Sequence, residues 1–278
     1  RAAAAGVQPP PELAELPGTM SAKFEGKVAA LVSIPSGDGP LVCAAVGNTV
    51  HVLDMAGNEV RTLQADGDIR VLRWWDTPKL LLVGCKDEQV IAFDGAGQRK
   101  WVFTSVMDQA VYEAAKQYWF KSASGHEGIH GLYTDVFIDG KEQAFVGSAC
   151  TLEILDESGQ LVKRLPVFWG PGWKFMMVDW PDETKRLCIA RWPNGTNTLA
   201  TVNPANFKVE RAFYGVPGDH TMVGGWSGLN ITDMFHVDMD GDGVKEVVHT
   251  TNGVWNRVTV FVNGTATHNA QFGPGVTT

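Results

Sequence analysis

Long apolar stretches are missing from this chain, and so are runs of basic residues. No segment approaches the roughly 18 apolar residues that a membrane-spanning helix needs. No Lys/Arg stripe offers the phosphate contacts of a nucleic-acid-binding surface, and the net charge is -8. We therefore expect neither a nucleic acid nor a membrane as partner. A local basic pocket for an acidic polysaccharide stays compatible with this composition.

Cysteine is scarce, and its spacing matches no metal-binding motif. The four cysteines, Cys43, Cys85, Cys150 and Cys188, each fall in a predicted strand of a different repeat. We interpret them as buried thiols, with inter-blade disulfides as the alternative. An initiator Met and a signal peptide are also absent, which indicates a processed or trimmed chain.

Helical periodicity is nearly absent, apart from a short stretch at 109–118, and a repeated strand–turn–strand pattern dominates the sequence. The turn is Asp54-Met-Ala-Gly57 in the first unit, and it recurs 40 residues later as Asp94-Gly-Ala-Gly97. A third copy is Asp156-Glu-Ser-Gly159, and weaker copies lie at 203–206 and 262–264. Asp hydrogen-bonds its own turn and Gly accepts positive φ, so each copy predicts a hairpin.

Two further apolar strands precede each hairpin, which gives four strands in about 40 residues, the period of a propeller blade. We predict an all-β fold, a β-propeller with at least five four-stranded blades, and we expect it to be part of a larger propeller or a longer multidomain chain. A β-sandwich is the alternative, but it does not predict one recurring turn. The expected blades are approximately 27–64, 69–104, 129–167, 173–215 and 229–272, after an N-terminal arm or linker at 1–26.

An acidic loop in the fifth unit has the spacing of a calcium site. Oxygen ligands at its positions 1, 3, 5, 7 and 9 can converge on one hard cation, and Gly243 permits the sharp turn. The expected ligands are Asp238, Asp240, Asp242, the carbonyl oxygen of Val244, and Glu246. Equivalent segments at 135–143 and 179–183 lack most of these ligands. We therefore predict structural Ca²⁺ in the fifth unit only, with a solvated acidic turn as the alternative.

The loop Asp238-Met-Asp-Gly-Asp-Gly-Val-Lys-Glu246 resembles the FG-GAP (VCBS-type) propeller repeat, and Asp94-Gly-Ala-Gly-Gln-Arg-Lys-Trp101 resembles a PQQ-like blade. Together the two resemblances cover most of residues 27–272. Such propellers are similar to those of secreted bacterial polysaccharide-degrading enzymes, including rhamnogalacturonan lyases and λ-carrageenase. The resemblance implies a secreted or periplasmic lyase or glycoside hydrolase that acts on an acidic or sulfated glycan.

Long insertions at 105–128 and 214–228 contain many of the candidate functional residues. For β-elimination we expect His126, Glu127 and Tyr118 as acid–base groups. Aromatic and cationic side chains suit a sugar ring and its carboxylate or sulfate. The expected substrate-binding residues are Trp119, Lys121, His130, Trp169, Trp173, His220, Trp226, Trp255 and Arg257.

The same residues also have a purely structural interpretation. The histidines can close turns, and the tryptophans can fill gaps between blades. The alternative function is accordingly a non-catalytic propeller that binds a glycan or a protein. The partner we expect is a polysaccharide or oligosaccharide, together with further blades or domains of a longer parent chain.

Overall fold

The computed structural model describes residues 22–107, 109–110, 113, 128–148, 151–166, 172–180, 184–191, 199–210, 231–251, 257–262 and 265–271. These residues form five four-stranded antiparallel sheets, and in each sheet the strands follow one another in chain order. Each sheet overlaps one of the five predicted blades.

The five blades contain twenty strands in all. In chain order they are β1 (Val28–Ile34), β2 (Leu41–Val46), β3 (Thr49–Leu53), β4 (Glu59–Gln64), β5 (Ile69–Trp75), β6 (Leu80–Cys85), β7 (Gln89–Asp94), β8 (Arg99–Thr104), β9 (Gly131–Ile138), β10 (Lys141–Ser148), β11 (Thr151–Leu155), β12 (Leu161–Pro166), β13 (Gly172–Asp179), β14 (Lys185–Arg191), β15 (Leu199–Val202), β16 (Val209–Glu210), β17 (Ile231–Val237), β18 (Glu246–Thr251), β19 (Arg257–Val262) and β20 (Thr265–Gln271).

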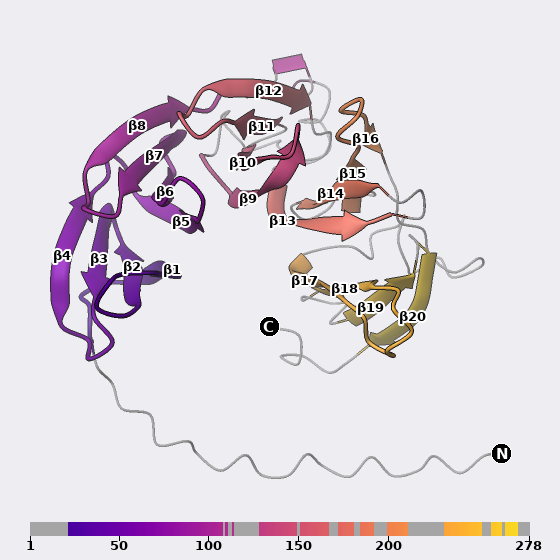
Figure 1. Ribbon diagram of the computed structural model, residues 1–278, viewed down its shortest axis with the longest axis horizontal. Coiled ribbons are helices and arrows are strands. Elements are labelled where there is room, and N and C mark those ends of the chain that lie inside the picture. Colours follow the sequence, from indigo (N-terminus) through magenta and orange to yellow (C-terminus); the bar gives the residue numbers. More distant parts are fainter. Residues whose placement is uncertain are drawn as a thin grey trace, which may run out of the picture.

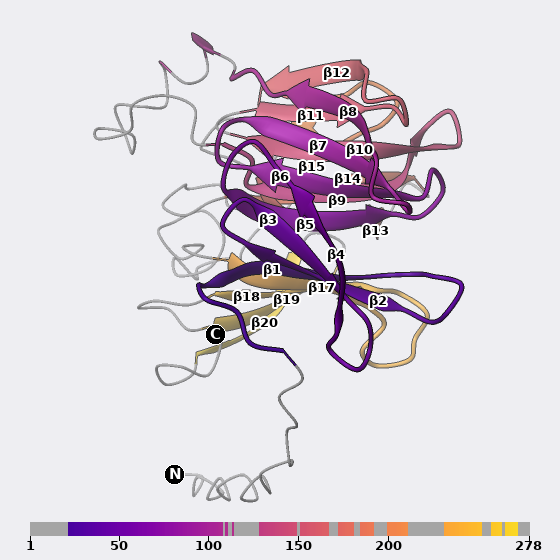
Figure 2. The same cartoon turned by 90° about the vertical axis from the view of Figure 1, so that its left-hand side faces the viewer.

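The blades stand around a common axis, with the first strand of each blade innermost (Figure 1). Neighbouring inner strands pack in chain order: β1 on β5, β5 on β9, β9 on β13, and β13 on β17. Among the described residues, β17 and β1 form no comparable packing, so the arc is open between blades 5 and 1. Seen from the side, the strands of the first four blades overlap one another (Figure 2).

The hydrophobic core lies between the blades, because each sheet is apolar on both faces. One cluster joins blades 1 and 2 through residues such as Val52 and Leu81. A second joins blades 2 and 3 around the fully buried Trp75, and a third joins blades 3 and 4 around Phe145. Blades that share apolar faces in this way form a β-propeller.

The repeated Asp-x-x-Gly turns have one common hydrogen-bond pattern. In blade 1, Asp54 Oδ1 accepts from the amides of Ala56 and Asn58 at 2.9 and 2.8 Å. Asp94 and Asp156 do the same in blades 2 and 3. Side-chain and backbone hydrogen bonds from Asn58 lower the pKa of Asp54. The predicted role of the aspartate is therefore confirmed in three blades.

The cysteines and the short helix also match expectation where the structure describes them. Cys43, Cys85 and Cys188 are free and buried, and burial raises the pKa of the Cys43 thiol to about 11. Cys150 lies outside the described residues. Gln109, Ala110 and Glu113 are helical. None of the described helical residues belongs to a helix long and apolar enough to span a bilayer.

Candidate functional site

The strand ends that flank the predicted site segments lie together at one end of the central channel. Each inner strand begins at this end, and the antiparallel second strand of the same blade ends there. Short backbone bonds link neighbouring blades here: Ile69 N donates to Gly47 O at 2.7 Å, and Ile129 N donates to Cys85 O at 2.9 Å. We call this end the channel mouth.

Most of the predicted catalytic and binding residues lie outside the described part of the chain. They are Tyr118, Trp119, Lys121, His126, Glu127, Trp169, His220, Trp226 and Trp255. Three predicted residues are placed, at least by their backbone. His130 directly precedes β9, Trp173 is the second residue of β13, and Arg257 begins β19. All three therefore lie where an inner strand begins or where a third strand leaves the mouth.

A β-bulge recurs at the channel mouth in four of the five blades. The register between the first two strands skips one residue at the second position of the inner strand. The skipped residues are Ala29, Arg70, Trp173 and Thr232. Bulges redirect side chains and are frequent beside functional sites. Arg70, which sequence analysis did not single out, thereby joins the predicted Trp173 in equivalent positions around the mouth.

Arg70 reaches from blade 2 to blade 3, where its Nη1 lies 2.7 Å from His130 Nε2. Because a guanidinium can only donate hydrogen bonds, His130 accepts at Nε2 and holds its own proton at Nδ1. The backbone amide of His130 donates to Gly147 O at 2.8 Å, which fixes the residue at the start of β9. The pair thus consists of one permanent cation and one neutral imidazole.

An open cavity of about 1370 Å³ extends from this pair along the inner strands. Its lining contains five cationic side chains, Lys27, Arg70, Arg73, Lys86 and Lys174, and three carboxylates, Glu25, Asp68 and Asp233. Two of the cations are paired, since Lys86 Nζ lies 3.2 Å from Asp68 and Lys174 Nζ lies 3.5 Å from Asp233. The cavity is therefore net positive within a chain of net charge -8.

Arg73 holds the second guanidinium of the cavity in a fixed position. Its Nε donates to Thr134 Oγ1 at 3.2 Å, and its guanidinium carbon lies 4.9 Å from the centre of the Tyr133 ring. Burial raises the pKa of Tyr133 to about 12, so its hydroxyl stays protonated and donates to Asp135 Oδ2 at 2.6 Å. The described inner strands therefore place cations, an imidazole and an aromatic ring in one cavity.

A buried carboxylate anchors the chain where the first insertion leaves blade 2. Glu153 is fully buried, accepts from the Val106 amide at 3.0 Å and from Arg164 Nε at 2.8 Å, and also accepts from the hydroxyl of Ser105. A buried carboxylate is costly unless it is paired and hydrogen-bonded, as this one is. Its position fixes the start of the insertion that contains the predicted catalytic residues.

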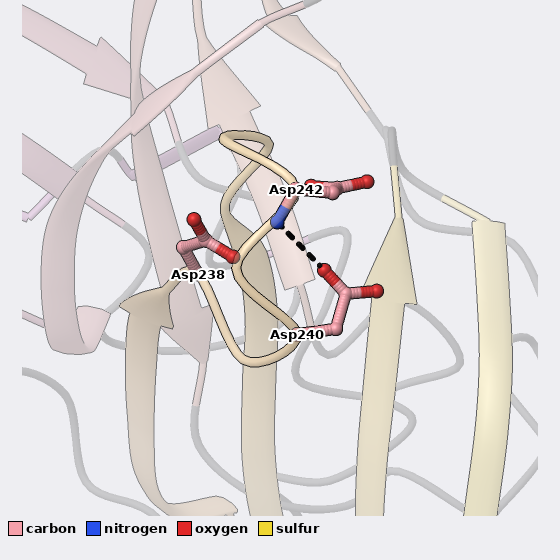
Figure 3. Close-up of side chains that lie close together, drawn as sticks. All are labelled: Asp238, Asp240 and Asp242. Carbon is pink, nitrogen blue, oxygen red and sulfur yellow. Dashed lines mark hydrogen bonds between the residues drawn. The ribbon is translucent and has the colours of Figure 1, made fainter.

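The acidic loop lies at the opposite end of the blade, between β17 and β18, so it is separate from the channel mouth. Ligand oxygens of Asp238, Asp240 and Asp242 all lie within 4.8 Å of one another, and all three residues are exposed (Figure 3). Gly241 and Gly243 have φ of 82° and 87°, as the sharp turn requires.

Hydrogen bonds within this loop already engage part of each carboxylate. Asp238 accepts from the amides of Gly241 and Gly243, at 2.7 and 3.0 Å. Asp242 Oδ1 accepts from the amide of Val244 at 2.7 Å. Glu246 is buried, accepts from the Met239 amide at 2.8 Å, and is not part of the close group among the described residues. The three aspartates are therefore assembled as predicted, whereas Glu246 closes the turn.

Comparison with known proteins identifies the architecture. No family model and no curated protein matches the chain. The solved structure of U3-55K matches with a TM-score of 0.61 and 11% identity, over 92% of this chain and 69% of that one. The WD40 repeats of RRP9 match with a TM-score of 0.62 and 11% identity, over 92% of this chain and 68% of that one. At this identity the likeness extends to the fold alone, and the fold is a β-propeller.

Proposed function

We propose that this β-propeller binds an acidic or sulfated glycan in its central channel, with Arg70 as the main anion contact. The observation that carries the proposal is the net positive cavity, into whose mouth a bulge directs Arg70. A guanidinium presents two parallel donors that match a carboxylate or sulfate, and Arg73, which lines the same cavity, adds charge. A secreted or periplasmic location goes with this ligand class.

The channel also offers a group for the uncharged part of a sugar. Tyr133, which is partly exposed, lines the cavity beside the cations, and aromatic faces stack on the apolar faces of sugar rings. This combination supports binding of an oligosaccharide better than binding of a bare inorganic anion.

The test measures binding of polygalacturonate, chondroitin sulfate and neutral dextran to Arg70→Gln. We expect the unmodified protein to bind one of the two acidic polymers and not dextran, and Arg70→Gln to lose about tenfold or more in affinity, because a charge-assisted hydrogen bond is removed. Lys100→Gln is the control: it removes the same charge from β8, outside the cavity lining. Equal affinities of the two variants, or equal binding of dextran, would contradict the proposal.

Catalysis on the same glycan is a second candidate, favoured by the position of His130. It lies three positions after Glu127 and four positions after His126, so the predicted acid–base groups directly precede the channel mouth in the sequence. The same polymers therefore serve as substrates, with ultraviolet absorbance of an unsaturated product for a lyase and reducing ends for a hydrolase. Loss of turnover in His126→Ala, with unchanged melting temperature and binding, supports this candidate; binding without turnover leaves the protein a binding module.

We further propose that the loop at 238–246 binds Ca²⁺ and that the ion has a structural role. Three carboxylates held close together repel one another unless a cation neutralises them, and Ca²⁺ prefers oxygen ligands. The groups that would hold the ion are carboxylate oxygens of Asp240 and Asp242 and the carbonyl oxygen of Val244. The loop lies away from the channel mouth, so the ion would stabilise blade 5 without contacting the glycan.

A further inference from the structure

The open end of the arc, at blade 1, has the features of a blade interface that lacks its partner. In an uninterrupted run of blades, each blade covers one face of the next. The exposed fraction of the fourth residue of the inner strand measures this cover. This fraction is 7% for Leu72, 8% for Phe175 and 7% for Met234. The equivalent residue of blade 1, Leu31, is 65% exposed.

A second contact recurs from blade 1 to blade 2, from blade 2 to blade 3 and from blade 3 to blade 4. The fourth residue after each turn glycine lies over the turn of the next blade. Arg61 donates to Gly95 O at 2.6 Å, and Trp101 Nε1 donates to Glu157 O at 3.1 Å. Lys163 places its Nζ 5.1 Å from the ring centre of Phe207 in the turn of blade 4. The position thus holds Arg, Trp or Lys, and always covers the following turn.

The corresponding turn of blade 1 faces a cavity instead. Gly57, the equivalent of Gly97 and Gly159, lines an open cavity of about 420 Å³ on the uncovered face. Phe24 lies on this face and contacts His51, with ring centroids 4.8 Å apart, and Glu25 and Glu59 also line the cavity. The lining also contains Lys23, and Glu59 is paired with His51 at 2.5 Å. Glu25 offers a further carboxylate to an ammonium or guanidinium like those that cover the turns of blades 2 and 4.

The room left in the ring also points to further blades. The five blades correspond to 69% of the U3-55K chain. The match leaves 31% of the U3-55K chain without a counterpart in this chain. A second copy of this chain, with 278 residues, is longer than that remainder. At the other end of the arc, Phe235 and Val237 of β17 are likewise exposed.

We infer that a further four-stranded blade of the same parent polypeptide docks on the face of blade 1 that carries Leu31. This blade presents Arg, Lys or Trp at the fourth position after its turn, and that side chain occupies the cavity above Gly57. The interface continues the apolar contacts that already join blades 1 to 4.

Cysteine labelling tests the inference. Leu31→Cys is made in the 278-residue chain and in its parent polypeptide, each with Cys150→Ser. Leu161→Cys, on the exposed side of β12, is the matched control. The buried native thiols Cys43 and Cys85 have raised pKa values, about 11 and about 12, and react slowly. We expect Leu31→Cys to react at least about tenfold more slowly in the parent polypeptide, and the control to react equally in both.

Each other outcome overturns the inference. Equal labelling of Leu31→Cys in both proteins means that no blade covers the face. Protection in the 278-residue chain that rises with concentration, together with a doubled mass by light scattering, identifies a second copy as the occupant. Concentration-independent protection in that chain means that its own residues cover the face. A parent polypeptide without further blade-length sequence contradicts the inference directly.

Discussion

Trp101 explains why the turn glycine of blade 3 is needed for more than its backbone angle. Gly159 has φ of 79°, and a Cβ added there would lie 2.5 Å from Trp101 Cδ2. Gly140, in the β9–β10 turn, has a similar φ of 68°, and nothing lies within 4 Å of a Cβ added there. A substitution at these two glycines therefore separates backbone strain from the steric clash between blades.

Alanine at the two glycines should destabilise the protein to different extents. Gly140→Ala adds only the strain of a left-handed alanine, about 1 kcal/mol. Gly159→Ala adds the clash with Trp101, and we expect about 2 kcal/mol more, as in an overpacked core. Urea unfolding measures both values. Trp101→Ala in the Gly159→Ala background should recover part of the added loss; equal losses for the two glycines would show that Trp101 does not restrict the turn.

At the scale of single elements, the β17–β18 loop differs from its counterpart in blade 3. There Gln143, at the position of Glu246, closes the turn by accepting from the amides of Phe137 and Ile138 at 3.2 and 2.9 Å. Hydrogen bonds alone therefore complete the β9–β10 turn. The loop in blade 5 carries three clustered carboxylates in addition. Because of these extra charges, we propose a cation site in blade 5 and an ordinary turn in blade 3.

Calcium should accordingly stabilise the protein through this one loop. After chelation, Ca²⁺ at about 100 times its Kd should add roughly 3 kcal/mol and raise Tm by a few degrees. Asp240→Asn should remove most of this rise, because it removes one carboxylate ligand. Asp139→Asn, in the turn of blade 3, should leave it intact. Calorimetry tests the proposal: no heat of binding and no change in Tm on adding Ca²⁺ would rule out the ion.

For the molecule as a whole, the sequence contained the architecture but only part of the site. Asp54, Asp94 and Asp156 form the turns expected of them, because an Asp–Gly turn depends on residues that are adjacent in sequence. Arg70 was missed because a bulge depends on the register with the partner strand, and its contact His130 is 60 residues away. The fourth turn also departed from the repeat: Phe207, with φ of 58°, takes the place of glycine.

The open arc also predicts that stability differs between blades. β1 and β5 are matched inner strands, each paired with one neighbour, but β5 lies between two blades and β1 has one face uncovered. Amides in less buried structure open at lower free energy. In the 278-residue chain, we expect amides of β1 to exchange at least about tenfold faster than the matched amides of β5, a difference of about 1.4 kcal/mol in opening free energy. Hydrogen exchange with mass spectrometry measures both strands at once, with the fully buried β6 as the slow reference.

Equal exchange rates for β1 and β5 would contradict this prediction. They would mean that the exposed face of blade 1 does not make β1 less stable. They would also mean that apolar contact with the preceding blade is not what protects β5.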